Sequence, residues 1–269
     1  MINYQPNSPL NNRFAVMVIL GDMVTPYADA FWLDEMLAKL GLLGLVERTG
    51  RSTLARMTKD GWFEVERVGR RSRYTITAWG MQVLRQGDLR VFEEAAPAWD
   101  GHWHLASYSL PEEKRALRNQ IRKQLLWLGY GNLSRGLWIS PYDRRESLLE
   151  GLKRSGIAPL IHFFSGAYQG ALDTQTMVES CWEIDKISDG YDQFLDRYSK
   201  RNLKNGKRLS AADAFLLRFR LSYDFLPLLR EDPNLPRQFL PPDWVGDRAR
   251  ALYQRLREQI GEINLSSKI

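Results

Sequence analysis

Positively charged side chains gather in residues 46–77, where eight Arg or Lys stand against four acids. If residues 47–60 form a helix, positions i, i+3, i+4, i+7, i+8 and i+11 share one face. That face carries Arg48, Arg51, Ser52, Ala55, Arg56 and Lys59. Guanidinium and ammonium groups in such a row can contact the phosphates and base edges of DNA. On this helix alone, a solvated basic surface would give the same pattern.

A second group of cations follows in residues 61–77, which alternate apolar and polar side chains as a β-hairpin does. Three arginines lie at its tip or beside it: Arg70, Arg71 and Arg73. Arginines do not favour the conformation of a tight turn, but they suit contacts with phosphates or the minor groove. Two helices, a basic helix and a basic-tipped hairpin are the order of a winged helix-turn-helix, whose third helix enters the major groove. The stretch therefore predicts binding to double-stranded DNA.

The elements that position these side chains form the first of three predicted regions, residues 1–96. Apolar periodicity predicts helices over 10–20, 30–40 and 47–60, and another from residue 78 towards 95. Asp29 is expected to cap the second helix, and Gly41 to end it. Val46, Gly50, Thr53, Leu54 and Met57 form the packing side of the basic helix.

The rest of the chain predicts an α+β fold with a central ferredoxin-like domain and a helical C-terminal domain. After Pro97, strands over 102–110, 134–141 and 158–168 alternate with helices over 111–129 and 144–156. This β-α-β-(β)-α-β order is that of a small ferredoxin-like domain, assigned to residues 97–172. Residues 173–269 are mainly helical, with predicted helices over 179–203, 210–232 and 247–264.

Composition points to a soluble, cytoplasmic protein. The 269 residues carry a net charge of +6 and a single cysteine, so no intramolecular disulfide is possible. The first 22 residues lack the features of a signal peptide. No apolar run approaches the roughly 20 residues that span a bilayer, and no membrane association is expected.

The sequence offers little for catalysis, metals or cofactors. His102 and His104 share a face of a predicted strand, but no acid or cysteine follows at a usual metal-ligand spacing, and only His162 remains elsewhere. Cys181 is expected to pack in a core. No phosphate-binding glycine loop or nucleophile elbow occurs. We expect no metal, no cofactor and no enzymatic activity.

Longer motifs give the chain a family resemblance. It resembles the PaaX family of bacterial repressors in "RMTKDGWFEVERVGRRSRYTIT", in "LLWLGYGNLSRGLWISP" and in "DPNLPRQFLPPDW". The resemblance covers nearly the whole chain. It implies a winged helix, a ferredoxin-like domain and a helical domain. It also implies a homodimer on palindromic operators, released by an aryl-acyl thioester of coenzyme A such as phenylacetyl-CoA, in the control of phenylacetate-type catabolism.

The effector would need an aromatic pocket with cations for the CoA phosphates. Trp138, Trp182 and Arg218 are the candidate lining residues, although Arg218 also suits a structural salt bridge. The basic residues 199–208 are a further candidate for the phosphates, or a solvated loop. Two alternatives stay open: a DNA-binding regulator gated by a protein partner, and a metal-dependent nuclease. The central domain is similar to ferredoxin-like nucleases of CRISPR systems, but the expected Asp is absent where the first strand ends, at Ser107 to Ser109.

Overall fold

The structure, a computed structural model, describes residues 10–26, 28–92, 98–152, 160–200 and 209–261. It divides into two compact units, each made from separate stretches of the chain. The first unit combines the N-terminal residues up to Phe92 with Arg197–Leu226 and the residues from Arg250 onward. The second combines Glu93–Asp196 with Pro227–Ala249. No helix in these described ranges has the length and apolar character needed to cross a membrane.

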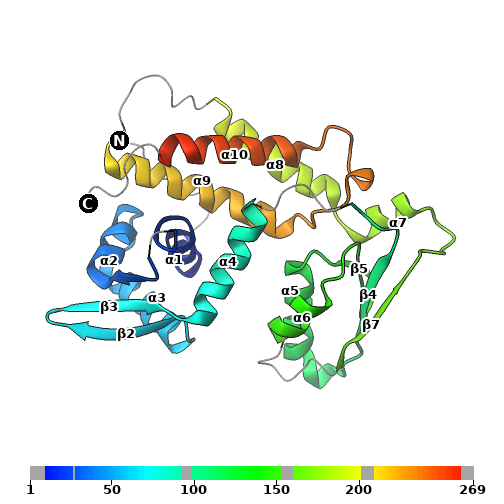
Figure 1. Cartoon of the computed structure of the whole chain (residues 1–269), viewed down its shortest axis with the longest axis horizontal. Coiled ribbons are helices and arrows are strands. Elements are labelled where there is room, and N and C mark those ends of the chain that lie inside the picture. Colours follow the sequence, from blue (N-terminus) through cyan, green and yellow to red (C-terminus); the bar gives the residue numbers. More distant parts are fainter. Residues whose placement is uncertain (1–9, 27, 93–97, 153–159, 201–208, 262–269) are drawn as a thin grey trace. The chain divides into compact units, whose positions relative to one another are not determined.

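The first unit contains the predicted winged helix-turn-helix. Its elements are α1 (Asn12–Ile19) with a π-helical turn (Leu20–Val24), β1 (Ala30–Trp32), α2 (Leu33–Leu42), α3 (Glu47–Lys59), β2 (Phe63–Val68), β3 (Arg71–Ile76) and α4 (Ala78–Phe92). The strands form an antiparallel sheet in the order β1-β3-β2. In Figure 1 the β2–β3 hairpin, drawn in cyan, projects beyond the three helices as a wing.

Strand β1 departs from the expected helix over 30–40. Residues 30–32 pair with β3, and helix α2 begins only at Leu33, with no side-chain cap. Phe31 explains the difference, because its ring packs edge-on against Phe63 at 5.3 Å and stacks on Tyr74 at 5.4 Å. The aromatic contacts to the wing strands thus hold these residues in extended form, and Asp29 is not the N-cap.

C-terminal residues complete the core of this unit. Phe215 and Phe219 of α9 (Ala211–Glu231) are buried in one cluster with apolar residues of α1, α2 and α3. Helix α10 (Val245–Gly261) contributes its residues from Arg250 onward to the same unit. The winged helix therefore shares its hydrophobic core with residues about 200 positions further along the chain.

The second unit holds the ferredoxin-like domain. Its elements are β4 (Trp103–Ser107), a 3₁₀ turn (Glu112–Lys114), α5 (Arg115–Trp127), β5 (Gly131–Ser134), β6 (Leu137–Ser140), α6 (Arg145–Leu152) and β7 (His162–Gly166). The antiparallel sheet has the order β5-β6-β4-β7, with the first strand in the middle beside the third. Helices α5 and α6 lie together over the sheet (Figure 1) and pack into one core cluster. The predicted β-α-β-(β)-α-β order is confirmed, and β5 adds the strand to which the sequence pattern assigned no residues.

The predicted helix over 179–203 is broken in two. Helix α7 (Thr174–Cys181) ends at Trp182, whose backbone is extended, and α8 (Ile184–Tyr198) starts just after it. Trp182 donates a hydrogen bond from Nε1 to the carbonyl of Gly129 at 3.2 Å and packs 6.1 Å from the ring of Trp103. These contacts with the ferredoxin-like domain set the break. A short 3₁₀ turn (Arg237–Phe239) follows α9 in the second unit.

Candidate nucleic-acid interface

Helix α3 presents its predicted basic face to solvent. All six residues of that face are exposed: Arg48, Arg51, Ser52, Ala55, Arg56 and Lys59. On the other side, Gly50, Thr53, Leu54 and Met57 are buried. Val46 departs from the expectation, because it takes the N-cap position and is 67% exposed.

Close packing against α2 holds this face in place. A Cβ at Gly50 would lie 2.7 Å from Leu37 Cδ2, so only glycine lets the two helices approach this closely without a shift. Leu54 is fully buried, and Met57 nearly so. The apolar side of α3 is therefore fixed in the core, and rotation of the basic face away from solvent would bury cations.

Local contacts orient two of the cations. Arg51 Nε donates to Glu47 Oε1 at 2.7 Å, one helical turn earlier, and both side chains are more than half exposed. Arg56 Nε donates to the carbonyl of Ser52 at 3.3 Å. Exposed ion pairs of this kind contribute little stability and are screened by salt, so Arg51 remains available to a stronger anionic partner.

The turn of the wing places one arginine at the extreme tip. Val68 pairs with Arg71, which leaves Gly69 and Arg70 as a two-residue turn. Gly69 has a φ of 59°, a conformation that favours glycine, as in the first position of a type II′ turn. Arg70 is exposed at the second position, and within the described residues its side chain has no ion-pair partner.

Arg71 is engaged within the protein. Its guanidinium donates to Asp34 Oδ1 at 2.8 Å and to Glu35 Oε1 at 2.8 Å, both in the first turn of α2. It also lies over the ring of Trp32. The hydrogen bond from Arg71 holds the pKa of the Asp34 carboxyl below its usual value, although slight burial acts the other way. Arg71 therefore ties the wing to α2, while its side chain stays 42% exposed, and its contact with DNA remains a prediction.

The other wing cations lie on the two strands. Arg73 Nη1 pairs with Glu66 Oε1 at 3.2 Å across the hairpin. Arg67, which the sequence pattern did not single out, is exposed beside the tip and donates from Nε to the carbonyl of Gly69 at 3.3 Å. Its position two residues before the glycine of the turn is the signal that could have identified it.

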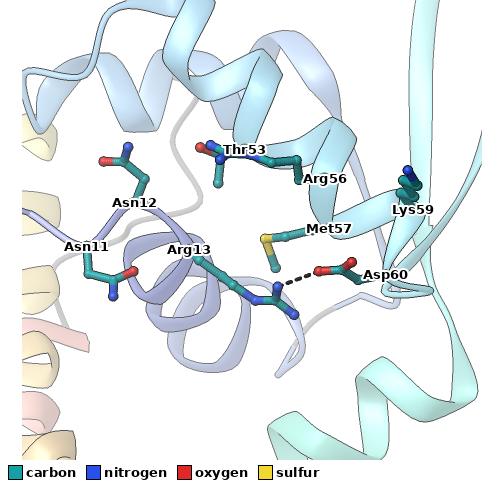
Figure 2. Close-up of a pocket in the computed structure, with 8 residues that line it drawn as sticks. All are labelled: Asn11, Asn12, Arg13, Thr53, Arg56, Met57, Lys59 and Asp60. Carbon is teal, nitrogen blue, oxygen red and sulfur yellow. Dashed lines mark hydrogen bonds and ion pairs between the residues drawn. The ribbon is translucent and has the colours of Figure 1, made fainter. Parts of the chain in front are cut away.

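A polar hollow of about 460 Å³ adjoins the basic face, between the start of α1 and the second half of α3 (Figure 2). Its lining residues are Asn11, Asn12, Arg13, Thr53, Arg56, Met57, Lys59 and Asp60. Arg13 reaches across from α1 and pairs with Asp60 at the end of α3. Sequence reasoning missed Arg13. The signal was available, since it is the single charged residue of the apolar stretch over 10–20.

Two of the three predicted ligand contacts lie on opposite faces of the ferredoxin-like sheet. Trp138 pairs with Ala106 and is buried with residues of α5 and α6. Trp182 packs instead on Trp103. Trp103 and Ala106 are three positions apart on β4, so their side chains point to opposite faces. Trp138 and Trp182 therefore do not face one another.

The third candidate, Arg218, belongs to the first unit. Its Nη2 lies 2.9 Å from Asp22 Oδ1, and both side chains are less than 8% exposed. Arg257 Nε and Ser222 Oγ each donate to the same carboxylate at 2.7 Å. Burial alone raises the pKa of Asp22, but the hydrogen bond from Arg218 and the charges of Arg257 and Arg218 outweigh it and lower that pKa. These bonds give Arg218 a structural role within the first unit, whereas Trp138 and Trp182 belong to the second. A shared ligand site of the three residues stays a prediction.

The remaining candidates are the histidines, Cys181 and the basic loop. Within the described residues, no three His, Cys, Asp or Glu side chains gather as they would around a metal ion. Burial raises the pKa of the Cys181 thiol, opposite to what a reactive cysteine needs. Most of the predicted basic loop, residues 201–208, lies outside the described residues.

Comparison with known proteins agrees with this arrangement. Three family models match in order: "PaaX-like protein" over residues 12–80, "PaaX protein central Cas2-like domain" over 96–178 and "PaaX-like protein C-terminal domain" over 182–265. An uncharacterised protein of Mycobacterium tuberculosis, Rv0674, has a similar fold, with a TM-score of 0.59, 19% identity and coverage of 93% of this chain and 96% of that one.

A relative of known function is also similar over most of its length. The Escherichia coli K12 protein named "Transcriptional repressor PaaX" is 30% identical over 258 residues, covering 92% of this chain and 81% of the relative. The match runs through the winged helix, the ferredoxin-like domain and the C-terminal helices. Together with the three family models, it shows that the chain belongs to the PaaX-like family.

Proposed function

We propose that this protein is a cytoplasmic, homodimeric transcriptional repressor that binds operator DNA through α3 and the wing. The observation that carries the proposal is the exposed cationic face of α3, fixed by a buried apolar side and adjoined by a basic-tipped hairpin. Phosphate contacts from such a surface supply affinity, and side chains in the major groove supply sequence specificity. The similarity to a relative named as a transcriptional repressor supports the proposed repressor function.

The proposed effector is an aryl-acyl-CoA, with phenylacetyl-CoA as the first compound to test. It would release the repressor from genes for phenylacetate-type aromatic acid breakdown. The second unit contains two buried tryptophans, Trp103 and Trp138, and the Nε1 of each lacks a hydrogen-bond acceptor among the described residues. A ligand carbonyl could satisfy either donor.

A mobility-shift experiment tests both parts. The purified protein is titrated onto DNA from upstream of its own gene and of the neighbouring genes, with and without phenylacetyl-CoA. We expect one upstream fragment to bind more tightly than unrelated DNA, and phenylacetyl-CoA to weaken that complex. Free coenzyme A and phenylacetate serve as controls for the two halves of the effector.

The outcomes separate the alternatives. Specific binding that phenylacetyl-CoA leaves unchanged would favour a regulator gated by a protein partner or by another ligand. Absence of binding to any upstream fragment would contradict the repressor proposal itself. Cleavage of the DNA in the presence of a divalent metal would instead favour a nuclease.

A further inference from the structure

The hollow between α1 and α3 carries more positive than negative charge. Its lining residues include three cations, Arg13, Arg56 and Lys59, against the single carboxylate of Asp60. That carboxylate already pairs with Arg13. An excess of two positive charges therefore surrounds the hollow, and an anion entering it gains from them.

Each of these cations keeps donors for another partner. Arg56 uses only its Nε in the bond to the Ser52 carbonyl, and neither its terminal nitrogens nor Lys59 has an ion-pair partner in the described part of the chain. Arg13 bonds Asp60 through Nη1, and its Cζ lies 5.7 Å from the centroid of the Trp62 ring. These contacts hold the Arg13 guanidinium beside the hollow while leaving its Nη2 free of any described bond.

The residues that line the hollow favour a polar, anionic partner over a small aromatic ligand. Met57 is the single apolar side chain among the eight lining residues, whereas pockets for small aromatic ligands are mostly apolar. The hollow is also continuous with the exposed row on α3, because Arg56 and Lys59 belong to both. A polar, cationic recess beside a DNA-reading helix suits the sugar–phosphate backbone that flanks the groove.

We propose that the backbone of one DNA strand enters this hollow and that Arg13, together with Arg56 and Lys59, contacts a phosphate there. The inference rests on the proposed DNA binding and extends the interface from α3 and the wing to α1. In the free protein Asp60 pairs with Arg13 without occupying all its donors, and the pair is not required for the phosphate contact.

Salt dependence of binding tests the contact. Operator affinity is measured at several salt concentrations for the wild type, Arg13→Ala and Lys59→Ala. Each lost phosphate contact should lower the slope of log affinity against log salt by about 0.9, so that the affinity lost between 50 and 200 mM salt becomes roughly three- to fourfold smaller. Each variant should lose the same factor of affinity on operator and on unrelated DNA, because phosphates carry no sequence information.

Asp60→Asn is the matched control, since it breaks the same ion pair but keeps Arg13. We expect this variant to retain the wild-type slope and to bind DNA slightly more tightly, because a carboxylate has been removed. If Asp60→Asn lowers the slope and the affinity as Arg13→Ala does, Arg13 acts by holding α3 and the proposal is wrong. A wild-type slope in Arg13→Ala, with salt-dependent binding by the wild type, also overturns it while leaving the proposed repressor function intact. If the wild type binds no DNA at all, the proposed repressor function is wrong, and the contact in the hollow with it.

Discussion

The Cζ of Arg71 on β3 lies 4.3 Å from the centroid of the Trp32 ring on β1, although the two residues are 39 positions apart in the chain. The same guanidinium bonds Asp34 and Glu35 at the start of α2. A planar guanidinium can stack on an aromatic face and donate in its own plane at once, which an ammonium cannot do. The strand residue that directly follows the turn of the wing is thereby attached to α2, the helix that packs against α3.

The first prediction separates the two adjacent arginines of the wing. Arg70→Ala should lower the salt slope of DNA binding by about 0.9 if one phosphate contact is lost. Arg71→Ala should instead increase amide hydrogen exchange in residues 63–76 of the free protein, because the tie to α2 is removed. Exchange measured by mass spectrometry without DNA, and anisotropy titrations with DNA, distinguish the two effects.

Arg71→Lys is the matched control for that prediction. It keeps the charge but loses the planar fork, so hydrogen exchange in the hairpin should rise almost as far as in Arg71→Ala. Wild-type exchange in both variants would show that the contacts with Trp32 and Asp34 do not hold the wing.

The second prediction concerns base recognition by Arg51. Its ion pair with Glu47 is exposed, and DNA can replace it. Arg51→Ala should weaken operator binding more than binding to unrelated DNA, by about 1–3 kcal/mol of discrimination if the arginine makes a bidentate contact with guanine. Competition titrations with both DNAs measure the difference. Equal losses on the two DNAs would assign Arg51 to a phosphate.

The third prediction concerns the stability of the first unit. Asp22→Asn removes the buried carboxylate and leaves Arg218 and Arg257 without its charge. Breaking a buried ion pair from one side costs about 3–5 kcal/mol of unfolding free energy. Urea denaturation measures the loss, and Glu66→Gln, which removes an exposed partner of Arg73, should change stability far less.

The pH dependence of that loss has a definite sign. The pKa of Asp22 is lower in the folded protein than its usual value. Its ionised form therefore stabilises the fold fully above the unfolded pKa of about 3.9 and loses that contribution as pH falls through the folded value. The stability difference between wild type and Asp22→Asn should stay constant from neutral pH down to about pH 5 and narrow below pH 4. If the stability difference between wild type and Asp22→Asn persists below pH 4, then packing rather than charge explains that difference.

The fourth prediction concerns release by the proposed effector. If phenylacetyl-CoA weakens operator binding tenfold, the coupling free energy is about 1.4 kcal/mol. Operator DNA must then weaken phenylacetyl-CoA binding by the same factor. Calorimetric titrations of phenylacetyl-CoA into the free protein and into the operator complex compare the two affinities. Equal affinities, or no heat in either titration, would remove this effector from the proposal.

Local patterns predicted the elements of the interface well. The basic row on α3 and the apolar side beneath it follow from helical spacing, and the wing follows from alternation around Gly69. The βαββαβ order of the second unit also follows from successive short patterns. In each case the decisive contacts lie within one element or between neighbouring elements.

The missed features depend on contacts between distant residues. The acids that bind Arg71 lie 36 and 37 positions before it, and Asp22 lies 196 positions before Arg218. Strand β1 has three residues, too few for alternation to reveal, and Trp182 ends α7 through its contact with Gly129. Periodicity within one segment contains no information on such partners, so the sequence could identify the cations but not which of them were already paired.

The bond from Arg257 to Asp22 joins residues 235 positions apart and has a consequence for synthesis on the ribosome. A nascent chain that has emerged only as far as α4 possesses the helices and hairpin of the winged helix, but its Asp22 carboxylate lacks both arginines. It also lacks Phe215 and Phe219, which fill the same core. Domains generally fold as units during translation. In this protein the hydrophobic core beneath α3 is completed only after α9 has been made, and Asp22 gains Arg257 only with α10. A chain that terminates before α9 therefore lacks both parts of this unit's interior.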